Sequence, residues 1–179
     1  MQSDIVKIIY DNTVDALYLY LFPADTNITR TDSFEIIDYI PFGNINLDFN
    51  KNKEIVGIEV LFVKDLFSKK FVAYIDASCL HPGLDPVETD IVVSKDIQLK
   101  DIVSIEYDKT TESVRFQFAA DDQKIERVET VVVEEDYVRS GDIKIGFNQN
   151  KEMIRMEITI ASGLLSKIFL ERLNREDKG

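Results

Sequence analysis

The sequence predicts an α+β fold, predominantly β, in which two repeats of antiparallel sheet are each followed by a short helix and are related by a pseudo-two-fold axis. Three observations predict this fold. The stretch NINLDFNKNKEIVGIE at 44–59 returns as DIKIGFNQNKEMIRME at 142–157. β-Branched and aromatic residues surround short polar turns, which is typical of hairpins. Near the end of each copy, the apolar residues change to helical spacing.

The first element of each repeat is a predicted hairpin. Residues 5–21, IVKIIYDNTVDALYLYL, contain two strands around a turn at Asp11, Asn12 and Thr13, whose short polar side chains favour turning. Residues 102–118, IVSIEYDKTTESVRFQF, predict the same hairpin. Six of these seventeen positions are identical between the copies, against about one expected from ordinary residue usage.

A polar loop and a single predicted strand follow each hairpin, with the strands at 38–40 and 136–138. The recurring stretch is then a second hairpin, because asparagines supply turn residues that tolerate a left-handed backbone. The unit is therefore hairpin, strand, hairpin and short helix, used twice. Apolar residues at helical spacing indicate the helices: Leu66, Phe67, Phe71 and Tyr74 in the first copy, and Leu164, Leu165, Ile168, Phe169 and Leu173 in the second. We expect each helix to cover one face of its sheet.

The chain between the copies is a predicted linker. Pro82, Gly83 and Pro86 cluster there, and IVVSKDIQL at 91–99 predicts an added strand. The predicted domains are 1–76 for the first repeat, 77–101 for the linker with its added strand, and 102–179 for the second repeat. Each repeat alone is small for a stable core, so we expect a shared interface, in a monomer with internal pseudo-symmetry or in a homodimer.

The charge balance bounds the function. The chain has 179 residues, 45% of them hydrophobic, and 21 Lys and Arg against 33 Asp and Glu give a net charge of -12. Such a field repels phosphate backbones and anionic membranes, so we expect no nucleic acid and no membrane as partners, and favour a protein with a basic surface. With no leader-like segment, no apolar run that could span a bilayer and the single cysteine Cys79, the sequence predicts a cytoplasmic protein.

The residues YDNTVDALYLYL at 10–21, followed by NLDFNKNKEIVGIEVL at 46–61, resemble a family of small bacterial domains of unknown function. The pattern of that family is YD, then DALY, then an acidic turn and GIEI. In the second copy ESVR at 112–115 replaces DALY and RME at 155–157 replaces GIE, so the chain reads as a tandem duplication with a degenerate second copy. The resemblance implies an antiparallel sheet plus helix and no known activity. Relatives encoded beside small toxin-like proteins imply an antitoxin- or immunity-like binding role.

Strand alternation separates an apolar face, shared by both copies, from a face that differs between them. The predicted core is Val6, Ile8, Leu17, Leu19, Leu21, Ile45, Leu47, Val56, Ile58 and Val60, matched by Val103, Ile105, Val114, Phe116, Phe118, Ile143, Ile145, Ile154, Met156 and Ile158. On the opposite face the first copy presents the residues that we call the tyrosine face: Tyr18, Tyr20, Asp48, Gly57 and Glu59. The second copy presents Arg115, Gln117, Lys144, Gly146, Arg155 and Glu157 there, which predicts a solvated surface.

The tyrosine face has two interpretations. Tyrosines combine apolar area with a hydroxyl, and a glycine on a neighbouring strand leaves room for a partner, so the face is a candidate interaction surface. In the structural alternative, Tyr18 and Tyr20 pack within the protein and Gly57 makes space for a cross-strand ring.

Three patterns of residues suggest metal binding or catalysis, and each has a simpler explanation. Asp48, Asn50, Asn52 and Glu59 fall at ligand positions of a calcium loop, but Lys53 replaces the glycine of that loop and the flanks predict strands, so turn chemistry is favoured. Cys79 and His81 lie two residues apart, where extended chain directs side chains to opposite sides, and they predict ordinary linker residues. Paired carboxylates among Asp11, Asp15 and Asp38 could serve acid-base hydrolysis, and their alternative role is turn and loop solvation.

The sequence therefore predicts a non-enzymatic protein-interaction module with no metal and no cofactor. One alternative is a module that binds a small ligand or a metal at the junction of the repeats. Another is an uncharacterised hydrolase.

Overall fold

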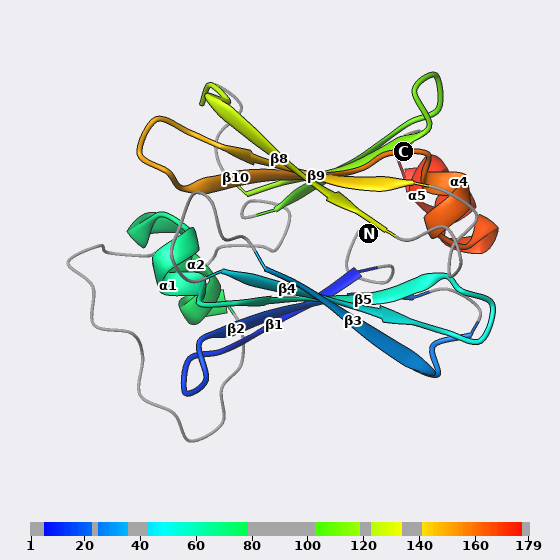
Figure 1. The fold of residues 1–179 in the computed structure, drawn as a ribbon, viewed down its shortest axis with the longest axis horizontal. Helices are drawn as coiled ribbons and strands as arrows, with labels where there is room; N and C mark the ends of the chain where they lie inside the picture. The colour runs from blue at the N-terminus through cyan, green and yellow to red at the C-terminus, as the bar shows by residue number, and fades with distance from the viewer. Residues whose placement is uncertain are drawn as a thin grey trace.

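Two five-stranded antiparallel sheets face each other, with short helices between them at both ends of the molecule (Figure 1). The computed structural model describes residues 6–22, 25–35, 43–78, 103–118, 123–133 and 141–176. The predicted linker, the added strand at 91–99 and the residues Asp38, Cys79 and His81 lie outside the described residues. Mostly β content and helices that follow each sheet confirm the predicted α+β fold of two repeats.

The first sheet has the strand order β1-β2-β5-β4-β3 and the second has the order β6-β7-β10-β9-β8. The strands of the first sheet are β1 (Val6–Asp11), β2 (Ala16–Leu21), β3 (Arg30–Glu35), β4 (Asn44–Phe49) and β5 (Ile55–Leu61). Those of the second are β6 (Ser104–Asp108), β7 (Ser113–Gln117), β8 (Arg127–Val132), β9 (Asp142–Phe147) and β10 (Met153–Ile158). The helices are α1 (Val63–Leu66) and α2 (Lys69–Ser78) after the first sheet, and α4 (Ala161–Leu164) and α5 (Lys167–Glu176) after the second.

The two repeats also share their unusual backbone conformations. Left-handed φ angles of 55° to 63° occur in the first repeat at Asp15, Lys53 and Phe62. Angles of 50° to 64° occur at the corresponding residues of the second repeat, Glu112, Lys151 and Ile160. A positive φ is uncommon for residues other than glycine. Its recurrence at equivalent positions shows that the turns, and not only the strands, repeat.

Each sheet has a strand in a segment for which the sequence predicted a polar loop. We expected strands at 38–40 and 136–138, which fall outside the described residues, and polar loops before them. Strands β3 and β8 lie within the segments that were predicted to be polar loops. Both are edge strands paired only with β4 and β9, and exposed residues alternate along β3. Strand β3 has a single apolar residue, Phe34, and therefore gives little sequence signal. Both edge strands carry an ion pair, Arg30 with Asp32 in β3 and Arg127 with Glu129 in β8.

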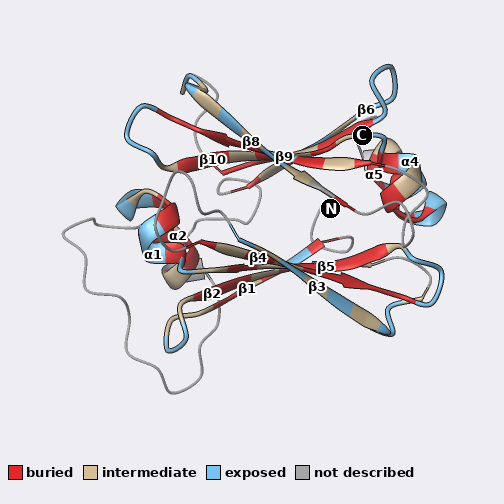
Figure 2. Ribbon diagram, in the orientation of Figure 1, coloured by how far each residue is buried: buried red, intermediate tan, exposed pale blue. Residues whose placement is uncertain are grey.

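The predicted core is confirmed, because every residue assigned to the apolar face is buried (Figure 2). The structure corrects one detail. An irregularity in the pairing of β4 with β5 places Phe49 opposite Ile55 and Asp48 opposite Gly57, so Val56 is an extra residue. Ile55 and, in the second repeat, Met153 belong to the core cluster, whereas Val56 and Ile154 are buried outside it.

The hairpin turn between β1 and β2 caps helix α1. The backbone N–H of Val63 donates to the Asp15 carbonyl at 3.3 Å, and the N–H of Lys64 donates to the Asp15 carboxylate at 3.2 Å. The second repeat repeats this arrangement, since the N–H of Ala161 donates to the Glu112 carbonyl at 2.6 Å. These contacts satisfy backbone donors at the start of each helix that have no partner within the helix.

The helices also join one repeat to the other. Phe67 and Phe71, from the helical segment of the first repeat, contact Phe118 of the second with ring centroids 5.3 and 5.6 Å away. On the other side, the Arg172 guanidinium of α5 donates to the Phe22 carbonyl of the first repeat at 3.1 Å. One hydrophobic cluster includes residues of both repeats. The helices therefore contact the opposite repeat as well as their own, which extends the prediction that each covers one sheet.

None of the helices in the described part of the chain is long and apolar enough to cross a membrane.

Candidate functional site

Strand alternation places the tyrosine face on the side of the first sheet opposite its core residues, which we call the outer side. The labelled helices and the second sheet lie on one side of the first sheet (Figure 1). Strand pairing brings the members of the tyrosine face together in two rows. Tyr18 on β2 is opposite Glu59 on β5, and Tyr20 is opposite Gly57. Asp48 on β4 follows Gly57 in the second row. The structure thus gathers all five residues of the tyrosine face on three neighbouring strands.

Tyr18 is fixed in place by its neighbours. Its hydroxyl donates a hydrogen bond to the Asp48 carboxylate, and its ring crosses Gly57, where an added Cβ atom would lie 2.5 Å from Cζ of Tyr18. Burial, the hydrogen bond to Asp48 and the charge of that carboxylate raise the pKa of Tyr18 above its ordinary value. The structural interpretation of Gly57, as space for a cross-strand ring, describes this geometry.

Asp48 is 7% exposed and accepts hydrogen bonds from two hydroxyl groups, those of Tyr18 and Thr31. Next to it, the Asn46 amide donates to the Glu59 carboxylate at 2.6 Å. Buried carboxylates are costly unless they are hydrogen-bonded, so these contacts hold Asp48 at this position. The sequence did not indicate Thr31, because its strand was predicted as loop.

Tyr20 differs from Tyr18 in its exposure. It is 37% exposed, and its ring centroid lies 4.2 Å from that of Tyr18 at an interplanar angle of 45°. Tyr18 therefore supports the Tyr20 ring from the side and leaves part of it open to solvent. The packing interpretation describes Tyr18, and the surface that remains available for contact is centred on Tyr20.

The corresponding face of the second sheet is chemically different. Arg155 occupies the position of Gly57, and its Nε donates to the Gln117 side chain at 2.8 Å. Lys144 is exposed, as a solvated face predicts, but Gln117 is buried at 5% exposure, contrary to that prediction. The Arg155 side chain, which is hydrogen-bonded to Gln117, contributes to the burial of Gln117. Gly146, in the position of Asp48, packs against Ile125.

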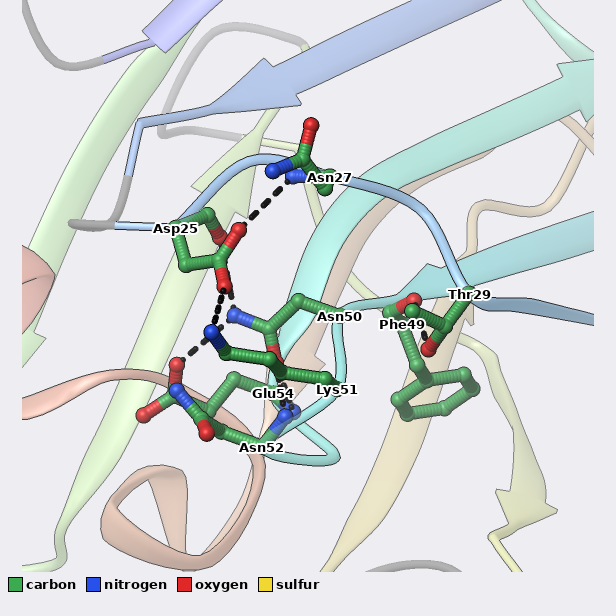
Figure 3. A network of polar contacts seen from close by, with 8 residues as sticks. All are labelled: Asp25, Asn27, Thr29, Phe49, Asn50, Lys51, Asn52 and Glu54. Carbon is green, nitrogen blue, oxygen red and sulfur yellow. Dashed lines mark hydrogen bonds and ion pairs between the residues drawn. The ribbon is translucent and has the colours of Figure 1, made fainter.

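Asn50 and Asn52, two of the residues that resemble a calcium loop, bond to the protein itself (Figure 3). Asn50 is 2% exposed, and its side-chain oxygen accepts from the N–H groups of Asn52 and Glu54 at 2.9 and 3.1 Å. Its amide nitrogen donates to the Asp25 carbonyl at 2.8 Å and to the Glu54 carboxylate at 2.9 Å.

Asn148 makes the equivalent contacts with Asn150 and Glu152. These contacts are turn chemistry, since asparagine oxygens accept from backbone groups two and four residues on. Lys53 makes the left-handed turn that was expected to need glycine. Among the described residues, no group of three or more His, Cys, Asp and Glu side chains is arranged to hold a metal ion.

Asp11 and Asp15, the described residues among the carboxylates considered for acid-base hydrolysis, have local structural roles. The Asp11 carboxylate accepts from the N–H of Thr13 at 2.9 Å. The Asp15 carboxylate caps α1 and also accepts from the Tyr10 hydroxyl at 3.0 Å. Neither belongs to the tyrosine face, and Asp38, Cys79 and His81 lie outside the described residues.

Comparison with known proteins gives a relationship for the first repeat. Residues 7–64 match the model of a family described as "Protein of unknown function (DUF2283)". The matched stretch runs from β1 into α1 and includes the whole tyrosine face. This supports the resemblance to a family of small domains of unknown function. No curated protein and no solved structure gives a significant match to the chain.

Proposed function

We propose that the protein is a non-enzymatic interaction module, and that its tyrosine face binds a basic surface of another protein in an antitoxin- or immunity-like manner. The observation that carries the proposal is the partly exposed ring of Tyr20, supported by the fixed ring of Tyr18 on a sheet side that none of the described helices covers. A rigid aromatic surface lowers the entropy cost of binding, and tyrosine is enriched at interfaces.

The net charge of the outer side of the first sheet favours a basic partner. Glu59 lies in the neighbouring row of the face, and Lys7, on the outer side of β1, is directly opposite Tyr20. The outer side of the first sheet carries four carboxylates against this one lysine within the described strands: Asp11, Glu35, Asp48 and Glu59. An arginine or lysine of a partner could lie on the Tyr20 ring, where cation–π attraction and nearby carboxylates act together.

The proposal assigns the binding to one repeat. Arg115 and Gln117 stand where Tyr18 and Tyr20 stand in the first repeat, so we take the second repeat as a diverged copy from a tandem duplication of a bacterial domain. The protein would act in the cytoplasm, as a monomer with internal pseudo-symmetry or as a homodimer. The net charge of -12 supports a partner that is neither nucleic acid nor membrane.

The test compares protein captured from native lysate by the wild type and by matched surface variants. Tyr20→Ser removes the exposed ring, whereas Val128→Ser removes an apolar side chain that is 51% exposed on the second sheet. We expect Tyr20→Ser to lose a basic partner at unchanged melting temperature and Val128→Ser to retain it. Capture that is salt-sensitive in the wild type would fit the electrostatic contribution. Equal capture by both variants, or loss only with unfolding, would refute the proposal.

A further inference from the structure

A pocket of about 520 Å³ lies between the two repeats. Asn52 and Glu54, in the β4–β5 turn of the first repeat, form one wall. Tyr107 and Lys109, from the β6–β7 hairpin, and residues of α4 and α5 form the rest. Its volume lies within the range of small-molecule sites, which often form where two structural units meet.

At the equivalent place in the first repeat, a hydrogen bond joins the hairpin turn to the helix. There the Asn12 amide donates to the Asp76 carboxylate at 3.2 Å, which joins the β1–β2 turn to α2. The equivalent residues of the second repeat are Lys109 and Asn174, which line the pocket. Neither makes a hydrogen bond or an ion pair within the described part of the chain. The hydrogen bond between Asn12 and Asp76 in the first repeat therefore has no equivalent between Lys109 and Asn174 in the second.

The Tyr107 hydroxyl shows the same change. Its counterpart Tyr10 is fully buried and donates to Asp15 at 3.0 Å. Tyr107 is half-buried, and its hydroxyl has no hydrogen-bond partner among the described residues. A tyrosine hydroxyl is neutral at physiological pH, and burial and the Glu112 carboxylate raise the pKa of Tyr107 further, so this group can donate a hydrogen bond. The pocket thus contains a hydroxyl, an ammonium group and amides that are available to a ligand.

The remaining residues that line the pocket indicate the charge and the apolar character of such a ligand. Leu165 and Leu170 are 3% and 7% exposed and supply an apolar wall. The other charged side chains have partners: Lys167 pairs with Glu171 at 3.7 Å, and Glu54 accepts from Asn50 at 2.9 Å. Among the charged side chains that line the pocket, Lys109 therefore has no partner in the described chain, and its positive charge favours an anionic ligand.

We propose that this pocket binds a small organic carboxylate with an apolar body. The carboxylate accepts hydrogen bonds from the Lys109 ammonium and the Tyr107 hydroxyl, and the apolar body lies against Leu165 and Leu170. Lys109 is exposed at the edge of the pocket, and its charge-assisted hydrogen bond is stronger than the neutral one from Tyr107, so we expect it to be the larger determinant of affinity. Because the walls come from both repeats, the ligand would also hold the repeats together.

The test uses two probes that share a ring and differ in charge, phenylacetate and benzylamine, titrated into isotope-labelled protein and followed by amide chemical shifts. Saturable shifts at Asn52, Tyr107 and Gly163 with phenylacetate, and none with benzylamine, are expected. Lys109→Gln should weaken phenylacetate binding about tenfold. Lys144→Gln removes a positive charge outside the pocket and should leave the affinity unchanged.

The double variant K109N/N174D restores the side-chain pair of the first repeat and should abolish binding. Its amide spectrum away from the pocket reports whether it remains folded. Binding of benzylamine as tight as that of phenylacetate, no saturable shift with either probe, or equal affinity in Lys109→Gln and the wild type would each overturn the proposal.

Discussion

Gly57→Ala tests whether the glycine exists to admit the Tyr18 ring. An added Cβ atom would lie 2.5 Å from Cζ of Tyr18, well inside van der Waals contact, so the ring must move. The hydrogen bond from Tyr18 to Asp48 is then lost, and a hydrogen bond to a charged group contributes about 1.5–3 kcal/mol to stability. The alanine returns about 0.4–1 kcal/mol by restricting the unfolded chain. We expect a net loss of about 1–2 kcal/mol in the free energy of unfolding.

For a chain of this length, that loss corresponds to a fall of about 2–8 °C in melting temperature, which circular dichroism can measure. The same substitution in a Tyr18→Ala background meets no ring and should be neutral or slightly stabilising. Gly146→Ala is the matched control in the second sheet, because its nearest neighbour is the flexible end of the Ile125 side chain at 3.0 Å. An equal cost of Gly57→Ala in both backgrounds would refute the reasoning.

Three further predictions concern the turns and the titrating groups. Asn50→Ala removes a side chain with four hydrogen bonds, two of them to backbone N–H groups, and should cost about 2–4 kcal/mol in chemical denaturation, while calcium should not shift the wild-type melting temperature. Because the pKa of Tyr18 is raised in the folded protein, its contribution to stability is full at neutral pH and is lost as pH rises above about 10; Tyr18→Phe should make stability between neutral and alkaline pH flatter. A backbone hydrogen bond from Thr110 and hydrogen bonds from the side chain and backbone of Thr111 lower the pKa of Asp108, so its contribution is present above about pH 4 and lost on acidification; Asp108→Asn should reduce the acid dependence of the denaturation midpoint.

Periodicity made the inner face of each sheet predictable. Side chains alternate sides along a strand, so Leu17 and Leu19 indicated the core without any knowledge of pairing. The repeated stretch likewise predicted two similar units. Strand β3 was missed for the complementary reason: it carries polar residues at most positions, so it shows no apolar alternation.

The candidate site was predictable as a set of residues but not as a geometry. Alternation placed Tyr18 and Tyr20 on one face, yet their different exposures depend on the direction of each ring across Gly57. Thr31 could not be assigned to Asp48 without its strand. The pocket at Lys109 was beyond a sequence argument, because its walls come from turns and helices whose approach depends on the packing of both repeats.

The contact of Phe67 and Phe71 with Phe118 makes the two halves mutually dependent. A fragment ending at residue 78 would expose two aromatic rings that the intact chain covers with the other half. Such a fragment would have to self-associate or recombine with the complementary piece, and two halves produced separately should reconstitute the protein by complementation. Neither repeat could then be lost by deletion without removing the other's folding partner.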